Sequence, residues 1–225
     1  VPHNGRIARN LMLAGNYLQS NILHFYHLAG QDYFQGPETV PFIPRYPHPD
    51  LRLTPSQNAL AVDEYIEALE VRQICHQLVA IFGGRMPHLQ GVLTGGAAQI
   101  PDKETILEYA ARMKKVRAFV EDRYLPLVYT IAGQYPELFD MAHGYRNALC
   151  VGVFPLAEPK KLYYSSGVYV DGRDEPFDGS RILEDVRYSW YEPAPSGMPV
   201  SRSQSIPDVN KKDAYSFVKD PTYAG

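Results

Sequence analysis

The chain has 225 residues, of which 45% are hydrophobic and 21% charged, and its formal net charge is −3 at pH 7. This composition is typical of a folded domain and excludes a largely disordered chain, and the small negative charge gives no general electrostatic reason to bind nucleic acid. A run of about 18 apolar residues is absent, and residues 1–30 lack a basic segment followed by an apolar one, so the sequence predicts neither a transmembrane helix nor a secretion signal.

The first predicted element is a helix over residues 5–31. Its apolar residues recur at spacings of four, seven, four and three, which is one helical face: Ile7, Leu11, Leu18, Ile22 and Phe25. A second face is polar but carries neither Lys nor Glu: Asn16, Ser20, His24, His27 and Gln31. Because a solvated face is normally rich in Lys and Glu, we expect this polar stripe to line an interior seam.

Prolines dominate the next segment, with six between residues 32 and 56: Pro37, Pro41, Pro44, Pro47, Pro49 and Pro55. Such a density excludes regular structure and predicts a surface connection. A second helix is predicted over residues 56–82, where Gly83 and Gly84 can take the backbone geometry that closes a helix.

A third helix is predicted after Asp102, whose carboxylate can cap the first turn. Helical spacing of apolar residues continues to Pro126, which should kink or restart the helix before it continues to residue 132. After about residue 148 short β-branched runs appear, at 148–154 and 161–170, and predict a small sheet or hairpin. The predicted fold class is therefore α+β and mainly α: a bundle of long helices over residues 1–147, followed by a small β-containing or irregular region over 148–225.

Two cysteines, Cys75 and Cys150, are too few for a disulfide framework and are not in a C-x-x-C pair. Both have apolar neighbours, so each is predicted to be a buried thiol that packs as a small hydrophobic residue. Familiar catalytic motifs are also missing. The glycines from 91 to 96 resemble a phosphate loop, but Ala97 and Ala98 stand where Lys and Ser or Thr are needed, and no G-x-S-x-G or H-E-x-x-H pattern occurs.

Two histidines of the first helix offer one possible site. His24 and His27, three residues apart, could hold a metal ion with His76 or His88 as a third ligand. No carboxylate is adjacent, and Phe25 and Tyr26 between them are packing residues. Hydrogen-bonded core histidines are therefore the favoured interpretation.

Residues 72–96 form the stronger candidate site. Arg72 and His76 lie one helical turn apart and are interpreted first as members of a buried hydrogen-bond network. Arg85 and His88 follow in the glycine-rich loop after the helix. Two cations and two imidazoles are costly to bury, and that cost is commonly accepted near an anion, a cluster or a reacting site.

These stretches together resemble the large subunit of nickel–iron hydrogenases. The resemblance is carried by RNL at residues 9–11, HFYHL at 24–28, residues 65–70 with Arg72 and His76, FGGRMPH at 82–88, the glycines at 95–96, YSWY at 188–191 and YSFVK at 215–219. Their order and spacing match over essentially the whole chain. Arg85 and Met86 in the loop, and residues 19–21 before the histidines, are most similar to the selenium-containing branch.

The resemblance implies reversible cleavage of dihydrogen at a nickel–iron centre, with electrons leaving through iron–sulfur clusters in a partner small subunit. In that family four Cys, or three and a selenocysteine, hold the metals from one C-x-x-C near each end of the large subunit. Neither pair occurs here. The chain is therefore expected to be roughly the middle half of a single large-subunit domain, with its metal ligands outside these 225 residues, and to be inactive alone.

The resemblance also suggests roles for six residues. It places Ser20, His24, Arg72 and His76 around the metal centre without ligating it, with Ser20 where many relatives have an Asp. It places Arg85 and His88 toward the subunit interface or the partner's nearest iron–sulfur cluster. Localisation is expected to be periplasmic, or on the outer side of the cytoplasmic membrane. The alternative is a non-catalytic structural or electron-transfer relative of the hydrogenase-like subunit of respiratory complex I, which keeps the helices without the four cysteines.

Overall fold

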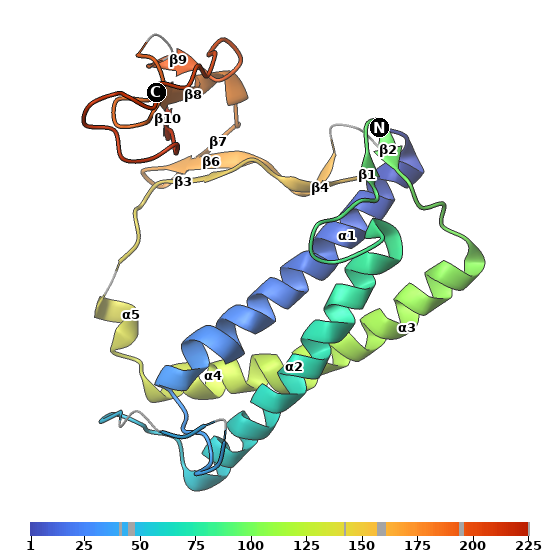
Figure 1. Cartoon of the computed structure of the whole chain (residues 1–225). Helices are drawn as coiled ribbons and strands as arrows, with labels where there is room; N and C mark the ends of the chain where they lie inside the picture. Colours follow the sequence, from blue (N-terminus) through green and yellow to red (C-terminus); the bar gives the residue numbers. More distant parts are fainter. Residues whose placement is uncertain (41, 45–47, 142, 157–160, 194–195, 225) are drawn as a thin grey trace. The chain divides into compact units, whose positions relative to one another are not determined.

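The computed structural model describes residues 1–224 except 41, 45–47, 142, 157–160 and 194–195. The described residues form two compact units: those of Val1–Gly144 with Phe154–Lys161, and those of Tyr145–Val153 with Leu162–Gly225. Figure 1 traces the chain through both. Within the described part of the chain, no helix has the length and apolar character needed to cross a membrane.

Long helices build the first unit. They are α1 (His3–Ile22), the π-helical turn η1 (Leu23–Ala29), the short 3₁₀ turn η2 (Gly30–Asp32), α2 (Pro55–Gly83), α3 (Lys103–Phe119), a second π-helical turn η3 (Val120–Tyr124), α4 (Leu125–Gln134) and α5 (Leu138–Met141). α1 lies alongside α2 in the opposite direction, and α3 packs against α2 (Figure 1). The described residues between η2 and α2 contain no helix or strand, as the prolines predict, although Pro41 and Pro47 lie outside the described residues.

Local sequence signals account for the helix ends. Thr54 and Gln57 form a reciprocal capping box at the start of α2, with Pro55 in the first helical position. α2 ends at Gly84, which has a φ of 79° and donates its N–H to the Ala80 carbonyl. Asp102 caps α3 by accepting the Thr105 N–H at 2.7 Å. The predicted capping by Asp102 and closure by glycine are confirmed.

The two π-helical turns are where the structure departs from the sequence prediction. Residues 5–31 were expected to wind as one regular helix, but η1 begins at Leu23. The second π-helical turn ends directly before α4, in which Pro126 occupies one of the first two positions. Because proline has no N–H, the turn before it cannot complete the ordinary hydrogen-bond ladder, and the restart expected at Pro126 is confirmed.

The core of the first unit follows one stripe of α2. Ala61, Ala68, Val71, Cys75, Leu78 and Phe82 are all at most 5% exposed and pack with Met12, Ile22 and Tyr26 from the first helix. α1 and α2 approach each other closely at Gly15, where an added Cβ would lie 2.9 Å from a Val79 methyl and 3.3 Å from the Cys75 carbonyl oxygen. The helices approach this closely because residue 15 has no side chain.

Short strands complete the fold. In the first unit β1 (Val92–Leu93) and β2 (Gly96–Ala97) form a hairpin. The second unit has two three-stranded antiparallel sheets, β3 (Ala148–Cys150), β6 (Gly167–Val170) and β7 (Arg173–Glu175) in the order β3-β6-β7, and β8 (Ile182–Asp185), β9 (Met198–Pro199) and β10 (Asp220–Tyr223) in the order β10-β8-β9. Strands β4 (Val153–Pro155) and β5 (Leu162–Tyr164) and a 3₁₀ turn (Gly179–Arg181) are also present. The predicted fold class, α+β and mainly α, is confirmed.

The two cysteines differ, which corrects the sequence prediction. Cys75 is fully buried in the α2 stripe, but Cys150 is exposed. Cys150 belongs to β3, an edge strand whose three residues are all exposed. Apolar neighbours along a chain bury a residue only where the element has a packed face, and this strand has none.

Candidate functional site

The seam between η1 and α2 contains His27 and Tyr65. Arg72, further along α2, lies within electrostatic reach of His27 and of Cys75 and His76 on its own helix. Burial lowers the pKa values of both histidines, and the nearby Arg72 guanidinium lowers them further. Burial raises the pKa of the Cys75 thiol to about 12, although Arg72 opposes that shift. At neutral pH the Arg72 cation therefore acts on two neutral imidazoles and a protonated thiol.

His27 is oriented by the backbone of α2. Its Nε2 lies 3.3 Å from the Tyr65 carbonyl oxygen, and its ring meets the Tyr65 ring edge to face at 4.7 Å. A carbonyl can only accept, so Nε2 carries the proton and donates it, which leaves Nδ1 as an acceptor. Among the described residues the buried His27 Nδ1 and Arg72 Nε have no hydrogen-bond partner. The network predicted for Arg72 and His76 is thus not formed within this part of the chain.

A buried acid beside the seam was missed from the sequence. The Tyr26 hydroxyl donates to Glu64 Oε2 at 2.9 Å, and the two residues are 0% and 3% exposed. Burial raises the pKa of both groups, while the bond from Tyr26 opposes the shift at Glu64. The sequence did contain a signal, because Glu64 takes one position of the apolar α2 stripe, three residues after Ala61 and four before Ala68.

Glu64 predicts a pH dependence of stability. A carboxyl whose pKa is raised in the folded state binds its proton more tightly there, so it favours folding below its unfolded pKa and loses that contribution as pH rises through the folded value. Urea unfolding of the wild-type chain should therefore show stability falling from about pH 4 upward, and Glu64→Gln should remove that part of the slope. Glu70→Gln, at an exposed position of the same helix, is the control. Identical slopes in wild type and Glu64→Gln would contradict the prediction.

The polar stripe expected to line an interior seam is mostly on the surface. Ser20, His24 and Gln31 are exposed, and Asn16 and His27 are half-buried. Within the described residues, Ser20 and His24 make no side-chain hydrogen bond. The expectation was wrong because the absence of Lys and Glu does not by itself mean burial. The exposed residues of this stretch recur every three or four positions and form its outward face: Tyr17, Ser20, His24, Leu28 and Gln31.

Arg85 and His88 are also exposed, which corrects the expectation that both are buried. The Arg85 Nε donates to the His88 carbonyl at 2.9 Å, and His88 has a φ of 64°. The Gly83 carbonyl closes the loop by accepting the N–H groups of Gln90 and Gly91. The loop is therefore held by its backbone and presents the two side chains on the surface.

Arg9 ties α1 to the strands after this loop. Its Nε donates to the Gly96 carbonyl at 2.9 Å and its Nη2 to the Leu93 carbonyl at 2.6 Å. The neighbouring Asn10 donates to the Pro155 carbonyl at 2.9 Å. Both residues of the RN pair that contributes to the family resemblance thus hold distant loops onto the first helix.

The described residues do not form a metal site. No group of three His, Cys, Asp or Glu side chains among them is placed to hold a metal ion. The site proposed from His24 and His27 with a third histidine is therefore not formed in this structure. The cysteines of the chain also do not fit the direct ligands of a nickel–iron centre. Such a centre takes four ligands of this type, whereas the sequence has two cysteines, and one of them, Cys75, is a buried thiol.

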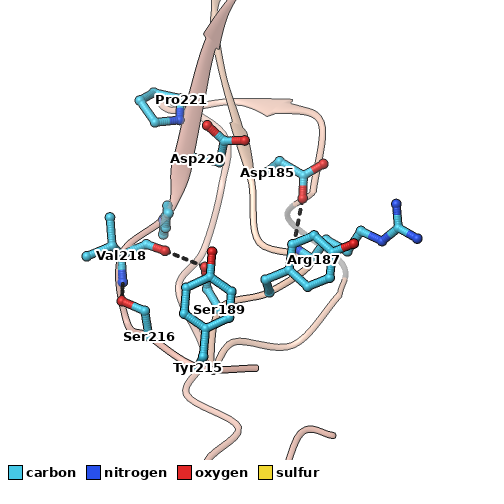
Figure 2. Close-up of a pocket in the computed structure, with 10 residues that line it drawn as sticks. Asp185, Arg187, Ser189, Tyr215, Ser216, Val218, Asp220 and Pro221 are labelled. Carbon is cyan, nitrogen blue, oxygen red and sulfur yellow. Dashed lines mark hydrogen bonds between the residues drawn. The ribbon is translucent and has the colours of Figure 1, made fainter. Parts of the chain in front are cut away.

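In the second unit the two late motifs pack against each other. The Trp190 N–H donates to the Ser216 carbonyl, and the Trp190 and Phe217 rings meet at 5.0 Å. Figure 2 shows the adjacent cavity, of about 790 Å³, where the Ser189 hydroxyl points to the Val218 carbonyl. These contacts hold the YSWY and YSFVK segments together in the second unit.

Comparison with known proteins identifies relatives over the whole chain. A family model described as nickel-dependent hydrogenase matches residues 1–39 and 35–225. The chain is 46% identical over 233 residues to the periplasmic [NiFeSe] hydrogenase large subunit of Desulfomicrobium baculatum, covering 99% of this chain and 45% of that protein. It is 25% identical over 292 residues to the hydrogenase-2 large chain of Escherichia coli. That alignment covers 100% of this chain and 51% of the Escherichia coli protein.

Solved structures agree. The Ni-Fe-Se hydrogenase from Desulfovibrio vulgaris Hildenborough superposes with a TM-score of 0.89 at 56% identity, covering 99% of this chain and 47% of that one. The reduced, active form of the Ni-Fe-Se hydrogenase from Desulfomicrobium baculatum superposes with a TM-score of 0.88 at 46% identity. The match covers 99% of this chain and 48% of that one. The chain thus spans about half the length of the relatives that it matches.

Proposed function

The chain belongs to the nickel-dependent hydrogenase family, and from this premise we propose that it forms part of a hydrogenase large subunit whose complete enzyme oxidises or evolves dihydrogen. The observation that carries the proposal is the family match over residues 1–39 and 35–225 together with close relatives named as [NiFeSe] hydrogenases. Each relative described above is a hydrogenase subunit, so the alternative of a complex I relative is not favoured.

The surface of the helices supports membership of a larger subunit. α2 exposes Leu60, Ile66 and Leu69 in addition to its buried stripe, and α3 exposes Ile106 and Leu107. A helix that is apolar on several sides is typical of a protein interior. We propose that other parts of the large subunit cover these faces in the assembled enzyme.

We propose that the metal ligands lie outside these 225 residues and that this chain shapes the surroundings of the centre. Arg72 and His76 would supply a fixed positive charge and a neutral imidazole there. Ser20 and His24 are exposed polar side chains that a further segment could cover. The groups around a metal site orient its ligands and control access of water, and their exchange commonly costs 10- to 100-fold in activity.

The isolated chain is expected to be catalytically inactive, because its sequence contains neither of the C-x-x-C pairs that hold the metals in this family. Purified residues 1–225, incubated with nickel and iron salts, should bind no stoichiometric nickel and should not reduce a dye in the presence of hydrogen. The two measurements are metal analysis and a spectrophotometric assay. Hydrogen-dependent reduction by the chain alone would overturn this part of the proposal.

We propose that the partner is a small subunit carrying iron–sulfur clusters and that the loop with Arg85 and His88 faces it. The exposure of both side chains supports this, since an interface needs accessible groups, and Arg is enriched at interfaces. The Desulfomicrobium baculatum relative is described as periplasmic, and we propose the same compartment, or the outer side of the cytoplasmic membrane, for the complete enzyme.

Exchange of His88 for alanine in the complete enzyme should change electron transfer more than metal content. Losing a donor near a cluster should lower that cluster's potential by about 40 mV, the one-electron equivalent of one hydrogen bond of about 1 kcal/mol. Redox titration followed by electron paramagnetic resonance measures the potential. Gln90→Ala in the same exposed loop is the control. Lost nickel with an unchanged cluster potential would contradict the assignment.

A further inference from the structure

Two consecutive residues of η1 bond to two consecutive residues of α2. The Tyr26 hydroxyl donates to the Glu64 carboxylate, and the His27 Nε2 donates to the Tyr65 carbonyl. Both contacts fall within a π-helical turn, whose wider winding differs from that of the α-helix before it. The orientation of this turn relative to α2 therefore determines both contacts together.

The first contact is the stronger anchor. Tyr26 is fully buried, and its ring is surrounded by Phe25 at 4.9 Å, Phe119 at 5.7 Å and Tyr124 at 5.9 Å. The hydroxyl at the end of this ring needs an acceptor in the core, and Glu64 provides it. The packing of the Tyr26 ring and the hydrogen bond of its hydroxyl together hold the side chain in one position.

The second contact is weaker and depends on the first. His27 is half-buried, its bond to the Tyr65 carbonyl is long at 3.3 Å, and that carbonyl already belongs to the α2 ladder. A bond of this length contributes little by itself. The position of the His27 ring must then follow from the backbone of η1, which Tyr26 anchors one residue earlier.

The acid at position 64 is otherwise hard to explain. Phe and Leu at positions 26 and 64 would fill the same space without taking a carboxyl group and a hydroxyl out of water, and replacing both partners of a buried hydrogen bond by apolar groups of similar shape can be nearly neutral for stability. What an apolar pair cannot provide is a directional bond that fixes the rotation of η1. Arg123 and Glu67 also act on the Glu64 carboxyl, and their charges oppose each other.

We propose that Glu64 is a positioning residue: through the Tyr26 hydroxyl it fixes the π-helical turn η1 and so holds the His27 imidazole against Tyr65 of α2. It makes His27 part of a defined seam with Arg72. The proposal stands apart from the hydrogenase activity, because it concerns contacts within this chain and is tested on the chain alone.

Nuclear magnetic resonance of the full 225-residue chain gives two readouts at His27: nuclear Overhauser effects between the His27 and Tyr65 rings, and the pKa of the imidazole. The His27 signals are assigned by their loss in His27→Gln. Global stability is measured in parallel by urea unfolding. A purely structural role of Glu64 would change the stability without moving either readout at His27.

Glu64→Leu and Tyr26→Phe should both lose the ring-to-ring effects and move the His27 pKa up toward the ordinary value of about 6.5. Glu64→Gln keeps an acceptor for the tyrosine and should show both wild-type readouts. Glu70→Gln, at an exposed position of α2, should never lose them. If Glu64→Leu does not fold, Tyr26→Phe decides, because it retains the buried ring. The proposal would be overturned if Tyr26→Phe and Glu64→Leu both kept the wild-type readouts at His27. It would also be overturned if Glu64→Gln changed these readouts as much as Glu64→Leu does.

Discussion

Replacing Gly91 with alanine is expected to destabilise the chain by about 3 kcal/mol, the upper end of the usual cost of overpacking. An added Cβ would lie 2.2 Å from the Phe82 carbonyl oxygen and 2.9 Å from the Gly83 Cα. Both atoms are backbone at the end of α2, so no side-chain rotation can relieve the clash. The loop would have to leave the helix end, and with it the bonds from Gln90 and Gly91 to the Gly83 carbonyl.

Gly96→Ala is the matched control, because nothing lies within 4 Å of the Cβ that it would add. Its effect should stay within about 0.5 kcal/mol, as for an unconstrained surface substitution. Urea unfolding followed by circular dichroism measures both variants. Equal stability of the Gly91 and Gly96 variants would show that the loop does not pack against the helix end as described.

Truncation of Phe82 to alanine should cost about 3 to 5 kcal/mol, the range found when a buried aromatic side chain is removed from a core. Phe82 is 1% exposed and its ring lies 5.5 Å from that of Tyr109, so it joins α2 to α3. The neighbouring helices are held by other contacts and cannot collapse fully into the space, which adds a cavity to the lost burial.

Phe139→Ala removes the same number of atoms at a position that is 68% exposed and should change stability by no more than about 0.5 kcal/mol. The difference between the two phenylalanine variants therefore measures burial rather than composition. Similar losses in both, measured by the same urea unfolding, would mean that the core does not run along this stripe of α2.

The helices could be predicted because their signals are local. Apolar spacing located α1, Asp102 marked the start of α3, and Gly84 closed α2 where expected. The π-helical turns could not be predicted in this way. A single-residue change in winding leaves the apolar spacing over a long window almost intact, so the pattern does not reveal it.

The candidate site was predicted in part. The cost of burying charge pointed to residues 72–96, and Arg72 and His76 are half-buried in the structure. Their placement near a metal centre stays a prediction. It leaves Arg85 and His88 exposed, because the direction of loop side chains depends on backbone angles such as the positive φ of His88. Glu64 was overlooked although it interrupts a regular apolar stripe. An acidic residue at such a position is a usable signal for a buried hydrogen bond.

The central claim is that these 225 residues act as part of a hydrogenase large subunit. It is tested most directly by replacing the matching segment of the Desulfomicrobium baculatum large subunit, 46% identical to this chain, with residues 1–225. The hybrid is co-produced with the small subunit of that enzyme and assayed for hydrogen-dependent dye reduction. We predict that the purified heterodimer contains nickel and oxidises hydrogen, whereas the Gly91→Ala hybrid assembles poorly. A heterodimer that assembles with full nickel content but has no hydrogen-dependent activity, beside an active parent enzyme, would contradict the claim.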